Sequence, residues 1–170
     1  MKRFLFAALA AVLGGTLSAH AADDMARGTF VSDCISAAAS TYRLPPTVLV
    51  ILLNVENGRL GEVTGNSNHT VDIGPMQVNA SWLPKLAAHW KASKEETYRA
   101  LRDEVCANIE GGAWILRQAL DEANGNLWEG VGLFHSHKEA QKTDYLRKVF
   151  QQVMRLQKQS SAETVQAEAK

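Results

Sequence analysis

A single acidic residue, Glu56, stands where a long apolar run meets a polar loop. Residues 48–53 are all apolar, and Glu56 is followed directly by Asn57 and Gly58. If the run forms a buried helix, desolvation raises the pKa of a carboxyl group at its end, and the negative end of the helix dipole acts in the same direction. A carboxyl group that stays protonated near neutral pH can donate its proton to a poor leaving group such as a glycosidic oxygen. Glu56 is therefore the candidate general acid, and the alternative is a helix-end glutamate that turns to solvent.

Other groups that could do chemistry carry weaker signals. Asp72 is the main rival as a second carboxylate, although an aspartate in a loop more often hydrogen-bonds to nearby backbone. Glu62 is expected to be a solvated loop charge. His69, His135 and His137 lack the ligand spacing of a known metal site, so neither a metal nor another cofactor is expected. Four tryptophans could stack on sugar rings, but their helical spacing is more typical of a core: Trp82, Trp90, Trp114 and Trp128.

The elements that must position Glu56 are predicted to be a helix and a loop. The β-branched residues of the apolar run would also suit a buried strand. Pro46 at its start and Asn57-Gly58 at its end favour a helix, because proline is tolerated in a first turn and Asn-Gly is a common stop. Residues 59–75 are rich in Gly, Asn, Ser and Thr, which predicts a loop with a small β-hairpin over residues 61–73.

The rest of the chain is predicted to be helical. The clearest stripe of apolar residues at helical spacing lies between residues 105 and 120. Further helices are expected over residues 33–43, from Asn79 or Ser81 through Trp82, from the capping box of Ser93 and Glu96 to about residue 102, over residues 103–123, after Asn126, and from Thr143 to about residue 156. The pattern therefore predicts a mainly α fold of about seven helices, with a small β-hairpin or loop beside the active site.

The two ends of the chain are expected to lie outside this single domain. A basic start, an apolar stretch over residues 4–17 and the sequence Ala19-His20-Ala21 predict a secretory signal peptide over residues 1–21. The alternative, a membrane anchor, is disfavoured because the apolar stretch is too short to span a bilayer comfortably. Residues 22–30 are predicted to be a polar leader, residues 31–157 the domain, and residues 158–170 a polar, disordered tail. We therefore expect a periplasmic or secreted protein with no integral membrane segment in the mature chain.

Composition bears on partners and on cross-linking. Removing Lys2 and Arg3 with the signal peptide leaves 16 basic against 18 acidic residues, and no basic patch indicates a nucleic-acid partner. The two cysteines, Cys34 and Cys106, are an even number in an exported chain, which favours a disulfide over two separate buried thiols. No Cys-x-x-Cys pair indicates a metal role for them.

Taken together, several motifs resemble those of the SLT-type lytic transglycosylases, which have a lysozyme-like fold. Within that family the sequence is most similar to the VirB1-like specialised enzymes of secretion, conjugation and pilus machinery. The motifs span most of the mature chain in the expected order. They are the apolar run ending in Glu56-Asn57, the segment DIGPMQVN over residues 72–79, VCANI over residues 105–109 with Gly112-Ala113, residues 130–136, and YLRKV over residues 145–149.

The resemblance implies a role for each matching residue. Glu56 corresponds to the single catalytic acid of the family, and Tyr145 to the tyrosine that hydrogen-bonds to that acid. The substrate-binding residues implied are Asn57, Met76, Gln77, Asn79, and the turn Phe134-His135-Ser136 across the cleft. Two positions depart from the family pattern: Asn57 replaces a common serine, and Phe134 replaces a tyrosine, which keeps a stacking surface but loses a hydroxyl.

The implied activity is cleavage of the bond between N-acetylmuramic acid and N-acetylglucosamine in peptidoglycan. Glu56 would act as both acid and base, and the muramic C6 hydroxyl would attack C1 to leave a 1,6-anhydro end. An intramolecular nucleophile explains why a second carboxylate is not needed. The implied partners are glycan strands and components of an envelope-spanning secretion, conjugation or pilus complex. Two alternatives remain open: a muramidase that uses water with help from Asp72 or Glu62, and a non-catalytic wall-binding scaffold.

Overall fold

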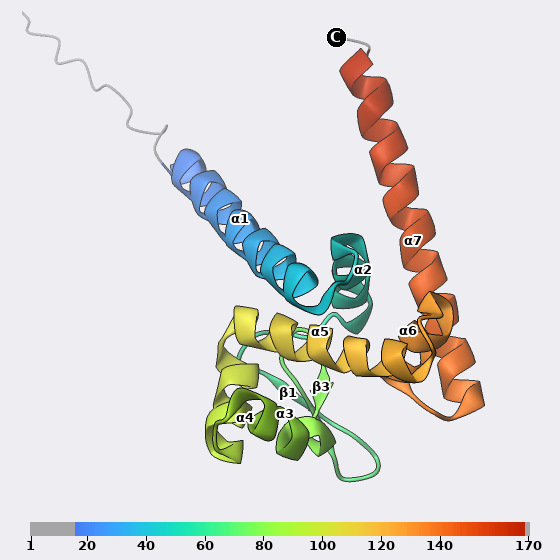
Figure 1. Ribbon diagram of the computed structural model, residues 1–170. Helices are drawn as coiled ribbons and strands as arrows, with labels where there is room; N and C mark the ends of the chain where they lie inside the picture. The colour runs from blue at the N-terminus through green and yellow to red at the C-terminus, as the bar shows by residue number, and fades with distance from the viewer. Residues whose placement is uncertain (1–15, 169–170) are drawn as a thin grey trace, which may run out of the picture.

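The structure is a computed structural model that describes residues 16–168, with side chains described from residue 25 to residue 162. Between residues 16 and 168 it contains seven α-helices, one 3-10 helix and three short strands (Figure 1). The predicted mainly α, lysozyme-like architecture is therefore confirmed. Most of the predicted signal peptide, residues 1–15, lies outside the described residues, and the remainder belongs to the first helix. No helix in the described part of the chain is long and apolar enough to cross a membrane.

Helix α5 (Val105–Glu122) lies at the centre of the domain. It packs against α1 (Thr16–Tyr42), α4 (Lys94–Asp103) and α6 (Leu127–His135). In the view of Figure 1, α1 and α2 (Pro46–Glu56) lie above α5, and the sheet, α3 (Leu83–Trp90) and α4 lie below it. Most of the predicted stripe of α5 is buried: Ile109, Ala113 and Leu116 are fully enclosed, and Leu120 is nearly so, whereas Val105 is half-buried. Burial of this stripe joins α1 and α2 on one side of α5 to the sheet, α3 and α4 on the other.

Helix α2 forms as predicted. Pro46 occupies its first turn, where a proline N–H would have no helical partner. The helix ends at Asn57, which adopts the left-handed conformation (φ 50°) and donates its backbone N–H to the Leu53 carbonyl. Leu49 and Leu52 are completely buried. Since both termini and the buried face are fixed, Glu56 is held as the last residue of a rigid helix.

The predicted hairpin is present and belongs to a three-stranded antiparallel sheet. Strand β1 (Val63–Gly65) pairs with β2 (Val71–Ile73), and β2 pairs with β3 (Val78–Asn79), with Asp72 opposite Asn79. The third strand has only two residues and is not apparent in the sequence pattern. The Asn79 side chain then caps the 3-10 helix η1 (Ala80–Trp82) by accepting the Ser81 N–H at 3.0 Å.

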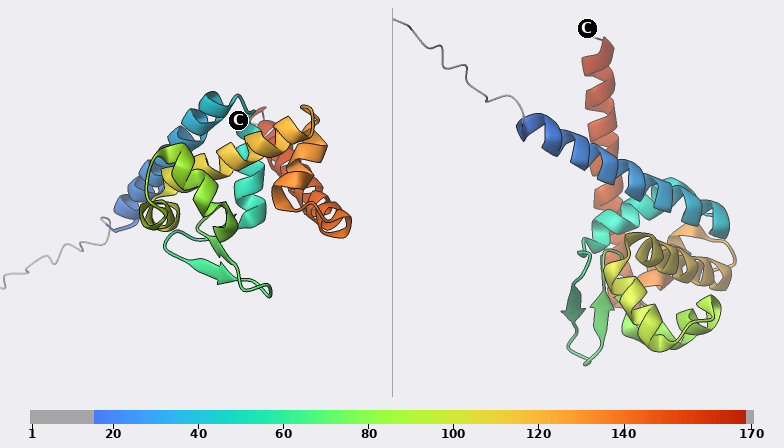
Figure 2. Two further views of the ribbon diagram at one scale, coloured as in Figure 1. Left: turned by 60° about the horizontal axis from the view of Figure 1, so that its bottom comes forward. Right: turned by 90° about the vertical axis from the view of Figure 1, so that its left-hand side faces the viewer.

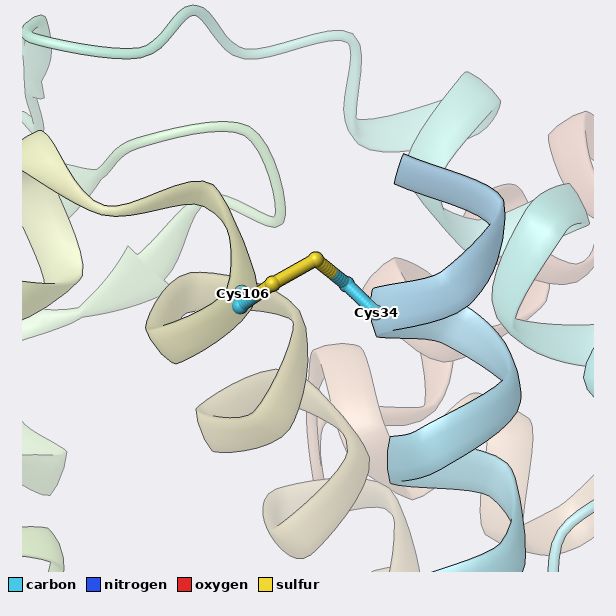
Figure 3. Close-up of a disulfide and its surroundings, with 2 residues drawn as sticks. All are labelled: Cys34 and Cys106. Atoms are coloured by element: carbon cyan, nitrogen blue, oxygen red, sulfur yellow. A yellow bond between two sulfur atoms is a disulfide. The ribbon is translucent and has the colours of Figure 1, made fainter. Parts of the chain in front are cut away.

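Cys34 and Cys106 form the predicted disulfide. Their Cα atoms are 5.0 Å apart, and the bond joins α1 to the first turn of α5 (Figure 3). On the chain-entropy model a cross-link over a separation of 72 residues stabilises the folded state by about 4 kcal/mol, and by less where the native geometry is strained.

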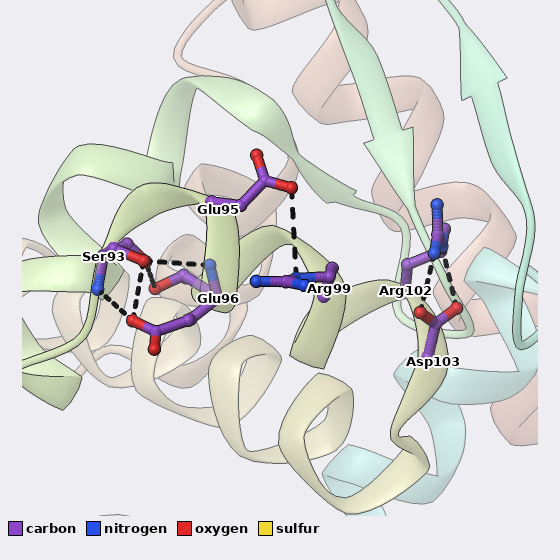
Figure 4. A network of polar contacts seen from close by, with 7 residues as sticks. Ser93, Glu95, Glu96, Arg99, Arg102 and Asp103 are labelled. Carbon is purple, nitrogen blue, oxygen red and sulfur yellow. Dashed lines mark hydrogen bonds and ion pairs between the residues drawn. The ribbon is translucent and has the colours of Figure 1, made fainter.

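The capping box at the start of α4 is also confirmed. Glu96 donates its backbone N–H to Ser93 Oγ at 3.2 Å, and the Ser93 N–H donates to Glu96 Oε2 at 2.9 Å. In Figure 4 this pair lies at one end of the helix and the Arg102–Asp103 ion pair lies near the other. Residue 104 separates α4 from α5, close to the predicted boundary.

The ends of the first and last helices differ from the prediction. Helix α1 begins at Thr16, well before the predicted start at residue 33, so residues 22–30, predicted to be a polar leader, are part of this helix. Helix α7 (Glu139–Glu168) begins before Thr143 and continues through most of the tail that was predicted to be disordered. Both segments lack proline, and the tail is rich in Gln, Lys, Ala and Glu, which are good helix formers. The prediction failed because it required an apolar stripe, whereas these helices extend beyond the domain without one (Figures 1 and 2).

Candidate active site

A cleft of about 690 Å³ opens beside Glu56. One wall is formed by the end of α2, the hairpin and η1, and the other by the end of α6 and the first turns of α7. The cleft brings together eight residues that the sequence analysis proposed for the site: Glu56, Asp72, Gln77, Asn79, Phe134, His135, Ser136 and Tyr145. Segments that lie far apart in the sequence therefore meet at one cavity.

Glu56 and Tyr145 form the central contact of the cleft. The Tyr145 hydroxyl donates a hydrogen bond to Glu56 Oε1 at 2.5 Å, although the two residues are 89 positions apart. Burial raises the pKa of Glu56 from 4.5 to about 7. The Tyr145 hydrogen bond opposes this rise in pKa, the negative charge of Asp72 adds to it, and the positive charge of Lys148 opposes it. The carboxyl group is therefore poised to exchange a proton near neutral pH.

Tyr145 is itself fixed by its neighbours. Only 2% of the residue is exposed. The His135 ring stacks on the Tyr145 ring with centroids 4.3 Å apart and an interplanar angle of 3°. The Phe134 ring is tilted against that of Tyr145 by 40°, with their centroids 6.5 Å apart. Burial and the charge of Glu56 raise the pKa of Tyr145, so it remains a protonated donor. Burial also lowers the pKa of His135, which favours a neutral ring near pH 7.

Asp72 lines the same cleft from strand β2. Its Oδ1 accepts a hydrogen bond from Asn79 Nδ2 at 2.7 Å, and the same amide group donates to Thr70 Oγ1 at 2.9 Å. The side chain is thus oriented by a cross-strand partner, and it bonds a side-chain amide rather than the nearby backbone that the sequence analysis favoured. Its negative charge acts on Glu56, which makes it available as an electrostatic helper.

The segment that carries Gln77 is held by two close backbone approaches. Gly58 donates its N–H to the Pro75 carbonyl at 3.1 Å, and a Cβ atom on Gly58 would lie 2.1 Å from the Gly74 carbonyl oxygen. Gly74 itself has φ 65°. Gln77 also adopts a positive φ of 48°, and its side-chain amide donates to the Gly74 carbonyl at 2.9 Å. Only glycine fits at position 58, so the Asn57-Gly58 pair serves both as a helix stop and as a packing site.

The side chain of Asn108 holds the segment that carries Gln77 in place through hydrogen bonds. It is completely buried in α5, its Oδ1 accepts the Met76 N–H at 2.6 Å, and its Nδ2 donates to the Ile73 and Leu101 carbonyls at 2.9 and 2.8 Å. Asn108 belongs to the VCANI motif, but no role was predicted for it. The available signal was its position next to Ile109, a polar residue on the buried face of an apolar stripe.

Two residues proposed to bind substrate lie elsewhere. Met76 is only 1% exposed and packs beneath the cleft against Gly112, where an added Cβ would lie 2.9 Å from Met76 Cε. Met76 is therefore a core residue, because its side chain turns inward while that of Gln77 lines the cleft. Asn57 is exposed and caps α2 without lining the cavity. Phe134 does line it, with no hydroxyl to offer.

Other cleft residues were not anticipated by the sequence analysis. Trp82, expected in the core, is half-buried, lines the cleft and packs edge-on against Trp114, with ring centroids 5.9 Å apart. Trp128 is also not a core residue, since it is 49% exposed. The further lining residues include Asn66, Ser67, Asn68, Ser81, Lys138, Gln141, Asp144 and Lys148. Their polarity matches a sugar-binding groove, in which hydroxyl groups need hydrogen-bond partners.

No grouping of three or more His, Cys, Asp or Glu side chains that could hold a metal ion occurs in the described part of the chain. Glu56 is the candidate for proton transfer in this cleft: Tyr145 donates a hydrogen bond to it, and the charges of Asp72 and Lys148 act on its pKa. An acid with a pKa near neutrality in a polar cleft suits cleavage of a glycosidic bond.

Comparison with known families agrees with this geometry. Residues 33–151 match the transglycosylase SLT domain family, and the match begins in α1 and ends in α7. No curated protein matches the chain. Because the matched segment covers well over half of the 170 residues and contains every element that lines the cleft, the chain belongs to the transglycosylase SLT domain family.

Proposed function

We propose that this chain is a peptidoglycan lytic transglycosylase in which Glu56 is the only general acid and base. The observation that carries the proposal is the 2.5 Å hydrogen bond from Tyr145 to a Glu56 carboxyl group whose pKa is raised to about 7 by burial in the cleft. Membership of the SLT family supports peptidoglycan as the substrate.

In the first step, protonated Glu56 donates its proton to the oxygen that bridges N-acetylmuramic acid and N-acetylglucosamine. The bond between muramic C1 and that oxygen breaks, and the N-acetylglucosamine side leaves as an alcohol. A pKa of about 7 leaves a large protonated fraction at neutral pH while keeping the proton easy to transfer. The Tyr145 hydroxyl holds the carboxyl group in one orientation and stabilises the carboxylate that forms.

In the second step, the muramic C6 hydroxyl attacks C1 of the same sugar. The Glu56 carboxylate accepts the hydroxyl proton, which restores the starting acid and leaves a 1,6-anhydro end. No water is consumed. A nucleophile within the same ring reaches a high effective concentration, so one carboxyl group is sufficient.

Hydrolysis with help from Asp72 is the second candidate, because Asp72 lines the same cleft and its charge acts on Glu56. Mass spectrometry of digested murein separates the two reactions. Transglycosylation gives 1,6-anhydromuramoyl ends, and hydrolysis adds the mass of one water and gives reducing ends. Reducing ends without anhydro ends would refute the leading proposal.

The catalytic role of Glu56 is tested by the variant Glu56→Gln. It should abolish clearing of murein, whereas Glu62→Gln, an exposed change directly before β1, should retain it. If Glu56→Gln clears murein as the unaltered protein does, Glu56 is not the catalyst. If the unaltered protein clears nothing, the non-catalytic scaffold is favoured over the enzyme.

We also propose that the enzyme is exported to the periplasm by a signal peptide over residues 1–21 and opens the wall for a secretion, conjugation or pilus machine, as in the VirB1-like subgroup. N-terminal sequencing of the exported protein should then begin at or near Ala22. Genes for such a machine are expected beside its own gene, and their absence would contradict the subgroup assignment.

A further inference from the structure

The charged groups that line the cleft differ in whether they have a hydrogen-bond or ion-pair partner. Glu56 accepts a hydrogen bond from Tyr145, and Asp72 accepts one from Asn79. Asp144 forms an ion pair with Arg147, one turn further along α7, with Nη1 and Oδ1 2.6 Å apart. In contrast, the ammonium groups of two lining lysines, Lys138 and Lys148, form no ion pair with the side chains that the structure describes, those of residues 25–162.

Although Lys148 is exposed, its charge acts on residues of the candidate active site. It follows Tyr145 by three residues on α7, so both side chains lie on the same face of the helix. Its positive charge lowers the pKa of Glu56 on α2 and also the pKa of His135 on α6. The ammonium group thus acts on residues from two other elements while remaining free to bind a further anion.

Resting on the proposed function, we infer that Lys148 binds a carboxylate on the muramoyl residue being cleaved and so makes the cleft selective for anionic glycan. Muramic acid carries a lactyl group, and its carboxyl group is free on strands that have lost their peptides. On strands that keep their peptides, the carboxylates belong to the peptide. In both cases the shared chemistry is a carboxylate that an unpaired ammonium group can bind through a charge-assisted hydrogen bond.

If Lys148 acted only by shifting the pKa of Glu56, a different kinetic result would be expected. A lysine that acts through the acid changes the pH profile of the reaction and leaves substrate binding alone. A lysine that binds the substrate changes KM, and it does so only when the substrate carries the carboxylate. The kinetic test must therefore vary the substrate as well as the residue.

The variants are Lys148→Met, which keeps the length of the side chain without its charge, and Lys148→Arg, which restores a cation. Lys158→Met on the exposed end of α7 is the matched control, because it removes the same charge away from the cleft. Each protein is assayed on three soluble substrates: peptide-free strands, peptide-bearing strands, and peptide-free strands whose lactyl carboxyl groups have been converted to amides. Thermal denaturation verifies that all variants are folded.

Lys148→Met should raise KM about fivefold on a carboxylate-bearing substrate, the size expected for one partly exposed ion pair. Because the loss of the Lys148 charge also raises the pKa of Glu56, the kinetic constants are compared at the pH optimum of each protein. KM on the amide substrate should not change, and Lys148→Arg should recover most of the loss. An effect on peptide-free strands identifies the lactyl carboxylate, and an effect on peptide-bearing strands alone identifies the peptide. An unchanged KM on both, or an equal rise on the amide substrate, would overturn the inference, and so would a shifted pH profile with no change in KM.

A binding arm keeps this test independent of catalysis. In the Glu56→Gln background, calorimetric titration with the same three substrates measures affinity without turnover. Adding Lys148→Met should weaken binding about fivefold for carboxylate-bearing strands only. If the unaltered enzyme cuts none of the substrates, the proposed function fails, and the binding titration still decides whether Lys148 reads the carboxylate.

Discussion

Replacing Glu56 by glutamine should make the protein more stable at alkaline pH. Glutamine has nearly the shape of glutamic acid, and its carbonyl oxygen can still accept the Tyr145 hydrogen bond that Glu56 Oε1 accepts at 2.5 Å. What the substitution removes is the ability to ionise in a buried place. The free energy of unfolding therefore reports directly on the unusual pKa of this residue.

The sign and size follow from the pKa. Burial raises the pKa of Glu56 from 4.5 to about 7 in the folded protein. Between these two pH values the folded protein keeps a proton that the unfolded chain has lost, so stability falls as the pH rises. The contribution is fully present below pH 4.5 and is lost as the pH passes the folded pKa of about 7. At about 1.4 kcal/mol per pH unit, the loss reaches about 3 kcal/mol.

Urea denaturation of both proteins at about pH 4 and about pH 8.5, with the disulfide intact, measures this loss. Other titrating groups affect both proteins alike, so only the difference between them matters. That difference should move by about 3 kcal/mol in favour of Glu56→Gln on going to the higher pH. Glu62→Gln, on the exposed loop, provides the control. A difference that changes by less than about 1 kcal/mol would refute the raised pKa and, with it, the physical basis for Glu56 as a proton donor.

Three further predictions address the neighbours of Glu56. Tyr145→Phe removes a hydrogen bond that lowers the pKa of Glu56, so the alkaline limb of the kcat/KM profile should move up by about 1 pH unit and kcat should fall about tenfold; an unmoved limb would contradict this role. Asp72→Asn removes a charge that raises the same pKa, so the limb should move down while mass spectrometry still finds anhydro ends; loss of product would instead make Asp72 catalytic. Asn108→Ala removes three buried hydrogen bonds and should lower the free energy of unfolding by about 3 kcal/mol in urea titrations. A loss below about 1 kcal/mol would mean that water replaces the amide.

The helix that ends in Glu56 could be predicted because its signals are local. Pro46 in the first turn and Asn57-Gly58 at the end define the boundaries without reference to any other part of the chain. The same holds for the capping box at Ser93 and Glu96. Local signals failed at the outer ends of α1 and α7, where nothing in the sequence stops the helix and no apolar stripe continues it.

The floor of the cleft could not be predicted from local patterns. Met76 and Gln77 are neighbours in one motif, yet one is buried in the core and the other lines the cavity. The positive φ angles of Gly74 and Gln77 decide which side chain faces inward. Asn108, more than thirty residues away, holds the backbone between them by accepting a hydrogen bond from the Met76 N–H. A contact of that sequence separation leaves no periodicity in the sequence from which it could be inferred.

One carboxyl group can serve as acid and then as base only if neither form is strongly preferred at the working pH. Burial alone would hold Glu56 protonated, and an exposed carboxyl group would be ionised. Here the Tyr145 hydrogen bond and the charge of Lys148 favour the carboxylate, while burial and Asp72 favour the acid, and the resulting pKa is about 7. If Lys148 binds a substrate carboxylate, its charge is neutralised when the glycan enters, and the pKa of Glu56 rises toward the acid form needed for the first step. Binding of the correct substrate would then itself prepare the proton that begins the reaction.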